Sequence, residues 1–256
     1  MVSIQTYHII LAGMAGLAVI VFTVLFFVKA GYGLFVSAKW GPSMPNRLAW
    51  TLMELPALAV FVLVWWHSGK GFGMPAAVFA SLFTLHYAQR ALLFPFMIKG
   101  NSRMPVLIVL MGTVFNVVNA VLMAISLFRF VPSWYLQGSA GLLRPQVIAG
   151  LLLFVAGMAI NIHSDSVIRH LRKPGDTAHH LPEKGLYRYV TSANYFGEIL
   201  EWTGFAIACD TPAAWLFVAW TFANLAPRAA AIRKRYCEEF GIGAVGRRKR
   251  LIPFIW

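Results

Sequence analysis

Residues 105–128 read PVLIVLMGTVFNVVNAVLMAISLF, a run that contains no charged side chain. The hydrocarbon core of a bilayer is about 30 Å thick, and a helix needs about 20 apolar residues to cross it. The run therefore predicts a membrane-crossing helix. A second uncharged run, residues 9–28, predicts another close to the start of the chain.

The composition extends this prediction to the whole chain. Of its 256 residues, 59% are hydrophobic and only 12% are charged, and the mean hydropathy is +0.68. A soluble domain carries roughly 25% charged residues. No repeat or low-complexity linker divides the sequence. We therefore expect one all-α integral-membrane domain, residues 1–256.

Apolar segments predict seven transmembrane helices. They cover residues 9–28, 48–66, 75–96, 105–128, 147–162, 195–209 and 212–225. The last two flank the turn Asp210-Thr211-Pro212 and are shorter than a full crossing. An alternative has four to six crossings, with the last pair forming a re-entrant hairpin.

The basic residues predict the orientation. With seven crossings, eighteen of the 22 Lys and Arg residues fall on the side of the C-terminal tail, three fall on the other side, and Arg90 lies inside a crossing. Cytoplasmic loops carry the excess of Lys and Arg. The C-terminus should be cytoplasmic and the N-terminus outside, so the net charge of +13 needs no nucleic-acid partner. The tail motif RRKR, residues 247–250, is equally suited to anionic membrane lipid.

Several common sites have no signature here. The histidines form no HxxH or HxxxH pair, and no Cys/His cluster has zinc spacing, so we expect no metal site. His163 and His170 are read as polar lining. Neither a GxGxxG turn after a strand nor a GxxxxGK[ST] loop occurs. Cys209 and Cys237 fall on or near opposite membrane sides, which argues against a disulfide.

Polar residues inside the apolar segments are the strongest sign of function. Asn194, Glu198 and Glu201 are spaced i, i+4 and i+7, and so share one helical face. No basic residue lies within a turn of them, although a charge inside a membrane costs about 2.5–3.5 kcal/mol even on the lenient scale. Ionisable residues in such positions usually mark a functional site.

A second polar face precedes the first. It contains Asn161, Asp165, Arg169 and Arg172, and Pro174-Gly175 should stop this helix. One polar residue alone would be explained by hydrogen bonds between helices. Two polar faces favour a ligand site, because a basic cluster follows them: Arg228, Arg233, Arg235 and Arg248. Such a site suits a large anionic ligand, with arginines for its phosphates.

Motifs along almost the whole chain resemble one family. They are WTLMELPA (50–57), NIHSD (161–165), LRKPG (171–175), GLYRYVTSANYFGEILEWTGFA (185–206) and LIPFI (251–255). In content, order and spacing the chain resembles the steroid 5α-reductases, the 3-oxo-5α-steroid 4-dehydrogenases. The resemblance implies a seven-helix membrane enzyme. Its NADPH would bind within about residues 145–256, facing the cytoplasm, and its steroid or sterol-like lipid substrate within about residues 1–130.

The resemblance also implies roles for individual residues. The cofactor-binding residues would be Asn161, Asp165, Arg172, Asn194, Glu198, Trp202, Arg228, Tyr236 and Arg248. Glu54 and Tyr87 would be catalytic, and Glu201 would pack or support its neighbours. The chain departs from many members in carrying Met53 where they have Gln, which affects the expected steroid preference.

The implied reaction is reduction of the Δ4 double bond of a 3-oxo-Δ4 steroid. Hydride would reach C5, and Tyr87, supported by Glu54, would hold the C3 oxygen as it becomes negative. Two alternatives are a membrane methyltransferase of the prenyl-cysteine type and a non-catalytic sterol- or lipid-binding protein. The Arg-His-Pro signature of the methyltransferases is replaced here by TSANYFG, residues 191–197. A lipid carrier would not need the phosphate-binding arginines.

Overall fold

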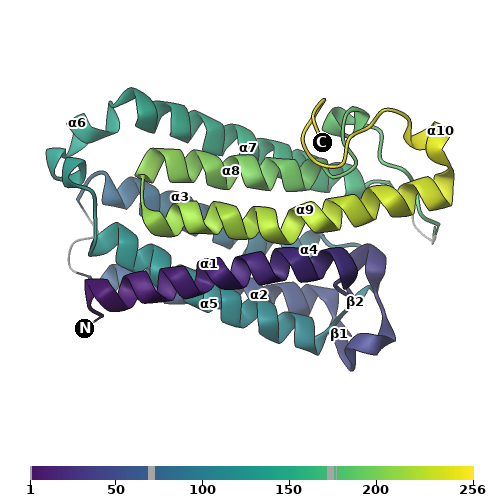
Figure 1. Ribbon diagram of the computed structural model, residues 1–256, viewed down its shortest axis with the longest axis horizontal. Coiled ribbons are helices and arrows are strands. Elements are labelled where there is room, and N and C mark those ends of the chain that lie inside the picture. The colour runs from purple at the N-terminus through teal and green to yellow at the C-terminus, as the bar shows by residue number, and fades with distance from the viewer. Residues whose placement is uncertain (1, 69–72, 172–175, 177) are drawn as a thin grey trace.

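The chain forms a bundle of long helices that lie side by side along its longest axis (Figure 1). The computed structural model describes residues 2–68, 73–171, 176 and 178–256. The long helices are α1 (Ile4–Phe27), α2 (Asn46–His67), α3 (Ala76–Ala88), α5 (Val106–Phe128), α7 (Pro145–Arg169), α8 (Ala193–Cys209) and α9 (Pro212–Phe240). The short helices are α4 (Phe94–Met97), α6 (Ser139–Leu142) and α10 (Ile242–Val245). The all-α prediction is confirmed apart from one two-stranded sheet of three residues per strand.

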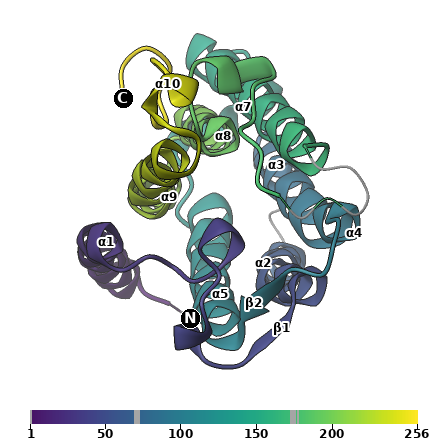
Figure 2. The ribbon, with the colours of Figure 1, turned by 90° about the vertical axis from the view of Figure 1, so that its right-hand side faces the viewer.

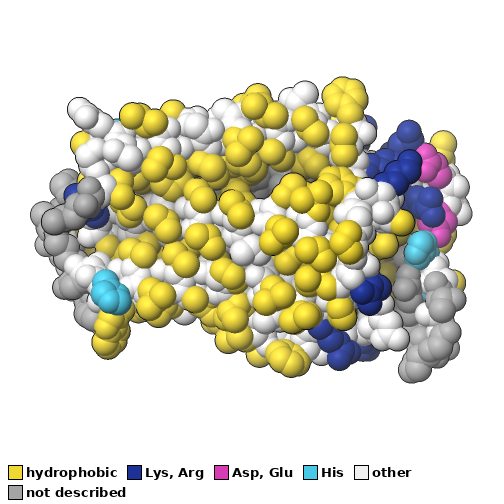
Figure 3. All heavy atoms as spheres, turned by 90° about the horizontal axis from the view of Figure 1, so that it is seen from below, with side chains coloured by type: hydrophobic (Ala, Val, Ile, Leu, Met, Phe, Trp, Pro, Cys, Tyr) yellow, Lys and Arg dark blue, Asp and Glu magenta, His cyan; other side chains and the backbone are white. Residues whose placement is uncertain are grey.

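The outside of the bundle is apolar, as expected of a protein surrounded by lipid. Four of the described helices are long and apolar enough to cross a membrane: α1, α2, α5 and α7. On α1, Ile9 is 71% exposed and Phe27 is 83% exposed. Figure 3 shows hydrophobic side chains over most of one face, and Lys and Arg gathered mainly toward one end of it. The chain is therefore a multi-pass membrane protein.

The helices surround a common interior when the bundle is viewed from its C-terminal end (Figure 2). Helix α1 packs on α9, α9 on α8, and α8 on α7. On the other side α2 packs on α5 and α3, while α3 also reaches α8. The helices of the first half, α2, α3 and α5, thus face those of the second half, α7 and α8, across the interior.

Four glycines let α7 and α8 approach until their backbones touch. Gly150 and Gly157 lie two turns apart on α7, as do Gly197 and Gly204 on α8. A Cβ atom added at Gly150 would lie 2.5 Å from the backbone nitrogen of Ala208, and one at Gly197 would lie 2.5 Å from that of Asn161. Small residues at helix contacts in membranes allow this close approach. The contact brings the two predicted polar faces together.

A π-helical turn interrupts the helix that begins as α3. Residues Gln89–Leu93 form this turn between α3 and α4, so that the helical chain runs unbroken from Ala76 to Met97. A π turn inserts an extra residue into the ladder of hydrogen bonds and often lies at a functional site. It buries Gln89 and Arg90 inside the bundle.

A short sheet joins two loops at the end of the bundle where the basic residues gather. Strand β1 (Ser43–Pro45) follows α1 and pairs with β2 (Arg103–Pro105) in an antiparallel register, with Met44 opposite Met104. Met104 is fully buried. No feature of the sequence indicated this pairing.

Two helices extend beyond the predicted apolar segments. Helix α7 continues to Arg169, past residue 162, so Asn161 and Asp165 are helical as predicted. The predicted stop at Pro174-Gly175 lies outside the described residues. Helix α9 continues to Phe240, past residue 225 and through Pro227. Beyond α10 the tail returns to the bundle, where Lys249 pairs with Val190. The hydrophobic pattern locates the apolar core of each helix but not its polar extension.

Candidate active site

Two acidic residues of the interior, Glu198 and Glu201, have no basic residue near them in the sequence. In the structure, Arg90 is the cation that lies beside the acidic residues of the interior. Its Nη1 atom donates a hydrogen bond to Oδ2 of Asp165 at 3.1 Å, and both residues are buried. Its guanidinium also lies over the rings of Trp50 (4.8 Å) and Phe94 (4.5 Å). Three further carboxylates lie within its electrostatic range, those of Glu54, Glu198 and Glu201. One arginine of the π turn is therefore the positive charge that interacts with acidic side chains from α2, α7 and α8.

Glu201 has a partner of its own in His86. The Nδ1 atom of His86 lies 2.8 Å from Oε1 of Glu201, and Glu201 is 1% exposed. The His86 ring packs against Trp202, with centroids 4.5 Å apart. This pair ties α3 to α8. The contacts of Glu201 are thus with His86 and the helix packing around it, and its role in the site stays a prediction.

The two predicted polar faces form one hydrogen-bonded network. Asn194 donates from Nδ2 to Oδ1 of Asp165 at 3.1 Å, and its backbone carbonyl accepts from Nδ2 of Asn161 at 3.0 Å. The Tyr187 hydroxyl donates to Oδ1 of Asn194 at 3.3 Å. Burial raises the pKa of Tyr187 well above its ordinary value, so the phenol remains a neutral donor. Both ends of the Asn194 amide are therefore fixed by the protein.

Glu54 and Tyr87 lie on the opposite side of the interior, each beside an asparagine of α5. Asn116 donates to Oε2 of Glu54 at 3.1 Å, and Nδ2 of Asn119 lies 3.5 Å from the Tyr87 hydroxyl. All four residues are buried. In the described part of the chain no hydrogen bond joins Glu54 to Tyr87 directly. The Tyr87 ring lies 6.1 Å from that of Trp202, which brings the two predicted halves of the site together.

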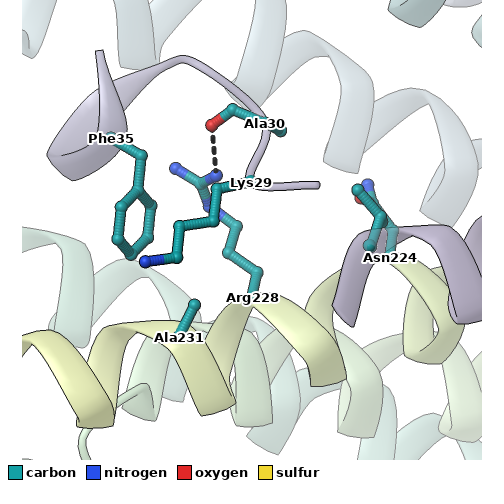
Figure 4. A pocket seen from close by; sticks show the side chains of 7 residues that line it. Lys29, Ala30, Phe35, Asn224, Arg228 and Ala231 are labelled. Atoms are coloured by element: carbon teal, nitrogen blue, oxygen red, sulfur yellow. Dashed lines mark hydrogen bonds between the residues drawn. The ribbon is translucent and has the colours of Figure 1, made fainter. Parts of the chain in front are cut away.

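Arg228 is held at the junction between α9 and the loop that follows α1. It donates to the Tyr195 hydroxyl at 2.7 Å and to the backbone carbonyls of Ala30 and Tyr32 at 3.3 and 2.9 Å. Figure 4 shows Arg228 and Lys29 at the pocket between these elements. Tyr236, farther along α9, lies within electrostatic range of Tyr187 and Tyr195. Arg228 and Tyr236 are thus connected to the network around Asn194 through two tyrosines.

Arg248 reaches the site through the C-terminal tail. Its Nη2 atom donates to Oε1 of Glu183 at 3.2 Å. The neighbouring residue Lys249 accepts a hydrogen bond from the backbone of Thr191 at 2.9 Å, three residues before Asn194. The tail therefore closes over the start of α8. Arg172, the remaining predicted cofactor residue, lies outside the described residues.

Several polar groups at the site have no hydrogen-bond partner in the part of the chain that the structure describes. The carboxylate of Glu198 makes no hydrogen bond or ion pair, and Glu198 is only partly buried. The buried atoms Nε1 of Trp202 and Nη1 of Arg248 also have no hydrogen-bond partner. Buried donors without a partner are rare and require an explanation. The Glu198 carboxylate can accept hydrogen bonds from an amide, and Trp202 and Arg248 can donate to oxygen atoms. These groups match a ligand that carries both an amide and phosphate oxygens.

Sequence reasoning missed four residues of this site. His86 and Arg90 lie on α3 and its π turn, and Asn116 and Asn119 lie on α5. Arg90 was visible as a charge inside an apolar segment, but its ion-pair partner Asp165 is 75 residues away along the chain. The asparagines were visible as amides three residues apart in an uncharged run. Among the described residues, no group of three or more His, Cys, Asp or Glu side chains could hold a metal ion.

The fold and the site together define an all-α membrane protein with a polar interior that two groups of helices share. One group presents a tyrosine and a carboxyl group within an aromatic surround. The other presents amides, acids and arginines from α7, α8, α9 and the tail. This division suits an enzyme that brings an apolar molecule and a charged one together.

Comparison with known proteins shows the family. Residues 102–256 match the model of the family described as 3-oxo-5-alpha-steroid 4-dehydrogenase. The chain is 37% identical over 247 residues to 3-oxo-5-alpha-steroid 4-dehydrogenase 1 of Bos taurus, covering 93% of each chain. It is 35% identical to steroid 5-alpha-reductase DET2 of Gossypium hirsutum over 100% of each chain, and 37% identical to 3-oxo-5-alpha-steroid 4-dehydrogenase 2 of Mus musculus over 96% of each.

The chain therefore belongs to the 3-oxo-5-alpha-steroid 4-dehydrogenase family. It is an enzyme of the oxidoreductase class, and the resemblance seen in its motifs is confirmed. Neither the methyltransferase nor the non-catalytic lipid-binding protein is favoured by these matches.

Proposed function

We propose that this enzyme reduces the Δ4 double bond of 3-oxo-Δ4 steroids with NADPH and forms 5α-dihydro products. The relatives are named as 3-oxo-5-alpha-steroid 4-dehydrogenases and as a steroid 5-alpha-reductase, which supports a steroid as the substrate. The observation that supports it most strongly is the approach of Tyr87 to Trp202, with ring centroids 6.1 Å apart. The proposed oxyanion donor then lies beside the wall of the proposed cofactor site, at a distance that suits reaction between two bound molecules.

Tyr87 is the group that would hold the C3 oxygen of the steroid. Its ring is fixed by Phe83, with centroids 4.6 Å apart, and Asn119 lies beside its hydroxyl. An amide that donates to the phenol oxygen leaves the phenol hydrogen free for the substrate. A donor placed at a developing oxyanion contributes about 2.7–4 kcal/mol to the rate.

Glu54 would support Tyr87 electrostatically, while a residue of α5 holds the Glu54 carboxyl group in position. Its carboxyl group lies within electrostatic range of the Tyr87 hydroxyl, and Asn116 fixes its position at 3.1 Å. The neighbouring aromatic rings of Phe61, Phe83 and Trp202 are buried and exclude water from this end of the site. Exclusion of water strengthens the interaction of Tyr87 with a charged oxygen.

The other half of the site would bind NADPH. A bound reduced nicotinamide supplies the hydride that C5 accepts, and a proton at C4 completes the product. The side-chain amide of Asn194 is already hydrogen-bonded to Asp165 and Tyr187. Glu198 and Nε1 of Trp202 are therefore the polar groups available to bind the nicotinamide end of the cofactor. Asn161, Asp165 and Asn194 would shape the pocket. Arg228, Arg248 and Tyr236 would lie nearer the phosphates. Arg172, which is outside the described residues, is proposed as a cofactor residue from its motif alone. The arginines favour NADPH over NADH.

We further propose seven membrane crossings, with the N-terminus outside and the cofactor site in the cytoplasm. The proposal is supported by seven long helical segments in the described residues and by the opposite locations of the two chain ends along the bundle (Figure 1). A tag at the C-terminus should be protected in sealed right-side-out vesicles, and a tag at Met1 should be accessible. The reverse pattern would refute this orientation.

The activity itself is tested with purified protein. NADPH consumption should require both the enzyme and a 3-oxo-Δ4 steroid, and a panel of such steroids would show which one is preferred. A steroid that lacks the Δ4 double bond is the matched control. Consumption that does not depend on the double bond would contradict the proposal.

A further inference from the structure

A second groove lies on the outside of α9, near its C-terminal end. Four residues of α9 line it at spacings of i, i+3, i+4 and i+7, which places them on one helical face. They are joined by one residue of α10 and one of the tail: the lining is Ala230, Arg233, Lys234, Cys237, Ile242 and Arg250. The groove has a volume of about 360 Å³. This volume lies within the usual range for a small-molecule site.

This groove is separate from the proposed cofactor site. Successive residues of an α-helix are about 100° apart around its axis, so Arg228 lies about 170° and Tyr236 about 110° from the centre of the groove face. Arg228 is buried against Tyr195 and the loop after α1. Arg233 belongs to the basic cluster seen in the sequence, but none of the groove residues is among the cofactor residues proposed above.

The groove is positively charged, and no acid lines it among the residues that the structure describes. Arg233 donates from Nε to the carbonyl of Arg248 at 2.8 Å, which fixes its position. Arg250 lies over the Trp256 ring at 5.1 Å. Lys234 lies 3.9 Å from Glu238, but the two side chains are 72% and 53% exposed, so this pair contributes little. Three cations thus converge on a space that suits an anion.

The edge of the groove is apolar. Ile242 lines it and is 76% exposed, and Phe254 in the same tail is 74% exposed. These residues belong to the end of the bundle where α10 and the tail lie (Figure 1). Cations beside exposed apolar side chains are typical of protein surfaces at the membrane interface. A free phosphate ion would make no use of Ile242, whereas a lipid would.

We propose that this groove binds the phosphate headgroup of an anionic phospholipid. Arg233, Lys234 and Arg250 contact the headgroup, and Ile242 contacts the lipid next to it. Bound lipid would link α9, α10 and the tail at the membrane surface. The site depends on the membrane placement of the bundle and not on the reaction proposed for its interior.

The test is native mass spectrometry of the purified full chain in detergent, titrated with phosphatidylglycerol or with phosphatidylcholine of the same acyl chains. The variant is Lys234→Gln/Arg250→Gln, which keeps the Arg233 contact to the tail. The matched control is Lys99→Gln/Lys184→Gln, which removes the same charge from exposed lysines in the loops after α4 and α7. Inorganic phosphate is added in a separate arm.

The wild type and the control should bind one phosphatidylglycerol tightly and show no such site for phosphatidylcholine. Each cation at an anionic headgroup is worth about 1 kcal/mol, a factor of about five. The Lys234→Gln/Arg250→Gln variant should therefore bind phosphatidylglycerol about 25-fold more weakly. An equal loss in the control, no loss in the variant, or displacement of the lipid by an equal concentration of inorganic phosphate would each overturn the proposal. NADPH binding that persists in both variants would show that they are folded.

Discussion

Arg90 and Asp165 form a buried ion pair across the interior of the bundle, with Nη1 and Oδ2 3.1 Å apart. The pair joins the π turn after α3 to α7, two elements from opposite halves of the chain. Asp165 also accepts from Asn194, and Arg90 lies among three further carboxylates. The helices proposed to bind the substrate and those proposed to bind the cofactor are therefore connected by charge as well as by packing.

Removing Arg90 should destabilise the protein strongly. Arg90→Ala leaves Asp165 buried without its cation, and breaking a buried pair on one side costs about 3–5 kcal/mol. The apparent melting temperature in detergent should fall markedly. Arg90→Met/Asp165→Leu should lose less than Arg90→Ala alone, because no charge then stays unpaired.

The matched control for this pair is Arg235→Ala. Arg235 lies 3.2 Å from Glu239 but is 46% exposed, so its loss should change the stability by less than about 1 kcal/mol. If Arg90→Ala melted at the same temperature as Arg235→Ala, the buried pair would not have the structural role described.

The close contact of α7 and α8 should not tolerate a methyl group. In Gly157→Ala the new Cβ would lie 2.6 Å from Cα of Glu201 and 2.7 Å from the carbonyl oxygen of Gly197. Backbone atoms cannot move aside as a flexible side chain can, and overpacking costs about 1–3 kcal/mol. The apparent melting temperature should fall by about 3–10 °C, and NADPH affinity should fall with it.

Gly13→Ala in α1 is the control for this change. A Cβ at Gly13 meets no atom within 4 Å, and alanine favours a helix more than glycine does. Its melting temperature should be unchanged or slightly higher. Equal effects at Gly13 and Gly157 would show that glycine content, and not the helix contact, controls stability.

The sequence predicted the helical membrane fold because bilayer thickness imposes a length that apolar runs reveal directly. It also predicted the shared faces of Asn161 with Asp165 and of Asn194 with Glu198, because helical periodicity is local. The partners of the acids were not predictable in this way. Arg90 and His86 reach Asp165 and Glu201 from 75 and 115 residues away. The π turn that orients Arg90 has no clear sequence signal, and neither has the pairing of Met44 with Met104.

Arg248 tests the choice of cofactor. Its Nη1 atom is buried without a partner in the described residues, so we expect it to bind an anionic group of NADPH. Arg248→Gln should weaken NADPH binding by about 1.5–3 kcal/mol, the range for hydrogen bonds to charged groups. If the contacted group is the 2′-phosphate, NADH binding should change little. Isothermal titration with both nucleotides measures this difference.

Arg247→Gln is the neighbouring control, because Arg247 is exposed. Equal affinity of the wild type for NADPH and NADH would refute the phosphate argument. The same loss in both variants would assign the effect to the charge of the tail as a whole.

Tyr87→Phe separates chemistry from folding. The variant should bind NADPH normally, because the proposed cofactor residues lie on α7, α8, α9 and the tail. Its steroid reduction should fall about 10²–10³-fold, the scale for one oxyanion donor. Asn119→Ala, which leaves the phenol but frees its orientation, should lose less. Glu54→Gln should also lose less than Glu54→Leu, because an amide can still form hydrogen bonds.

Tyr135→Phe is the control for this loss. Tyr135 is buried and donates to the carbonyl of Cys209 at 3.0 Å, so its variant loses a buried hydroxyl away from the proposed site. It should lose stability but keep turnover per folded molecule. A folded Tyr87→Phe enzyme with near-normal turnover would contradict the proposed role of Tyr87 as the oxyanion donor.

The most direct test of the proposed reaction follows the hydride itself. Purified enzyme is incubated with a 3-oxo-Δ4 steroid and NADPH that carries deuterium at both hydrogen positions of the nicotinamide C4, and the product is examined by NMR. We predict a 5α-dihydro steroid with one deuterium at C5 and none at C4. A product without deuterium at C5, or no reduction of any 3-oxo-Δ4 steroid by folded enzyme that binds NADPH, would contradict the proposed function.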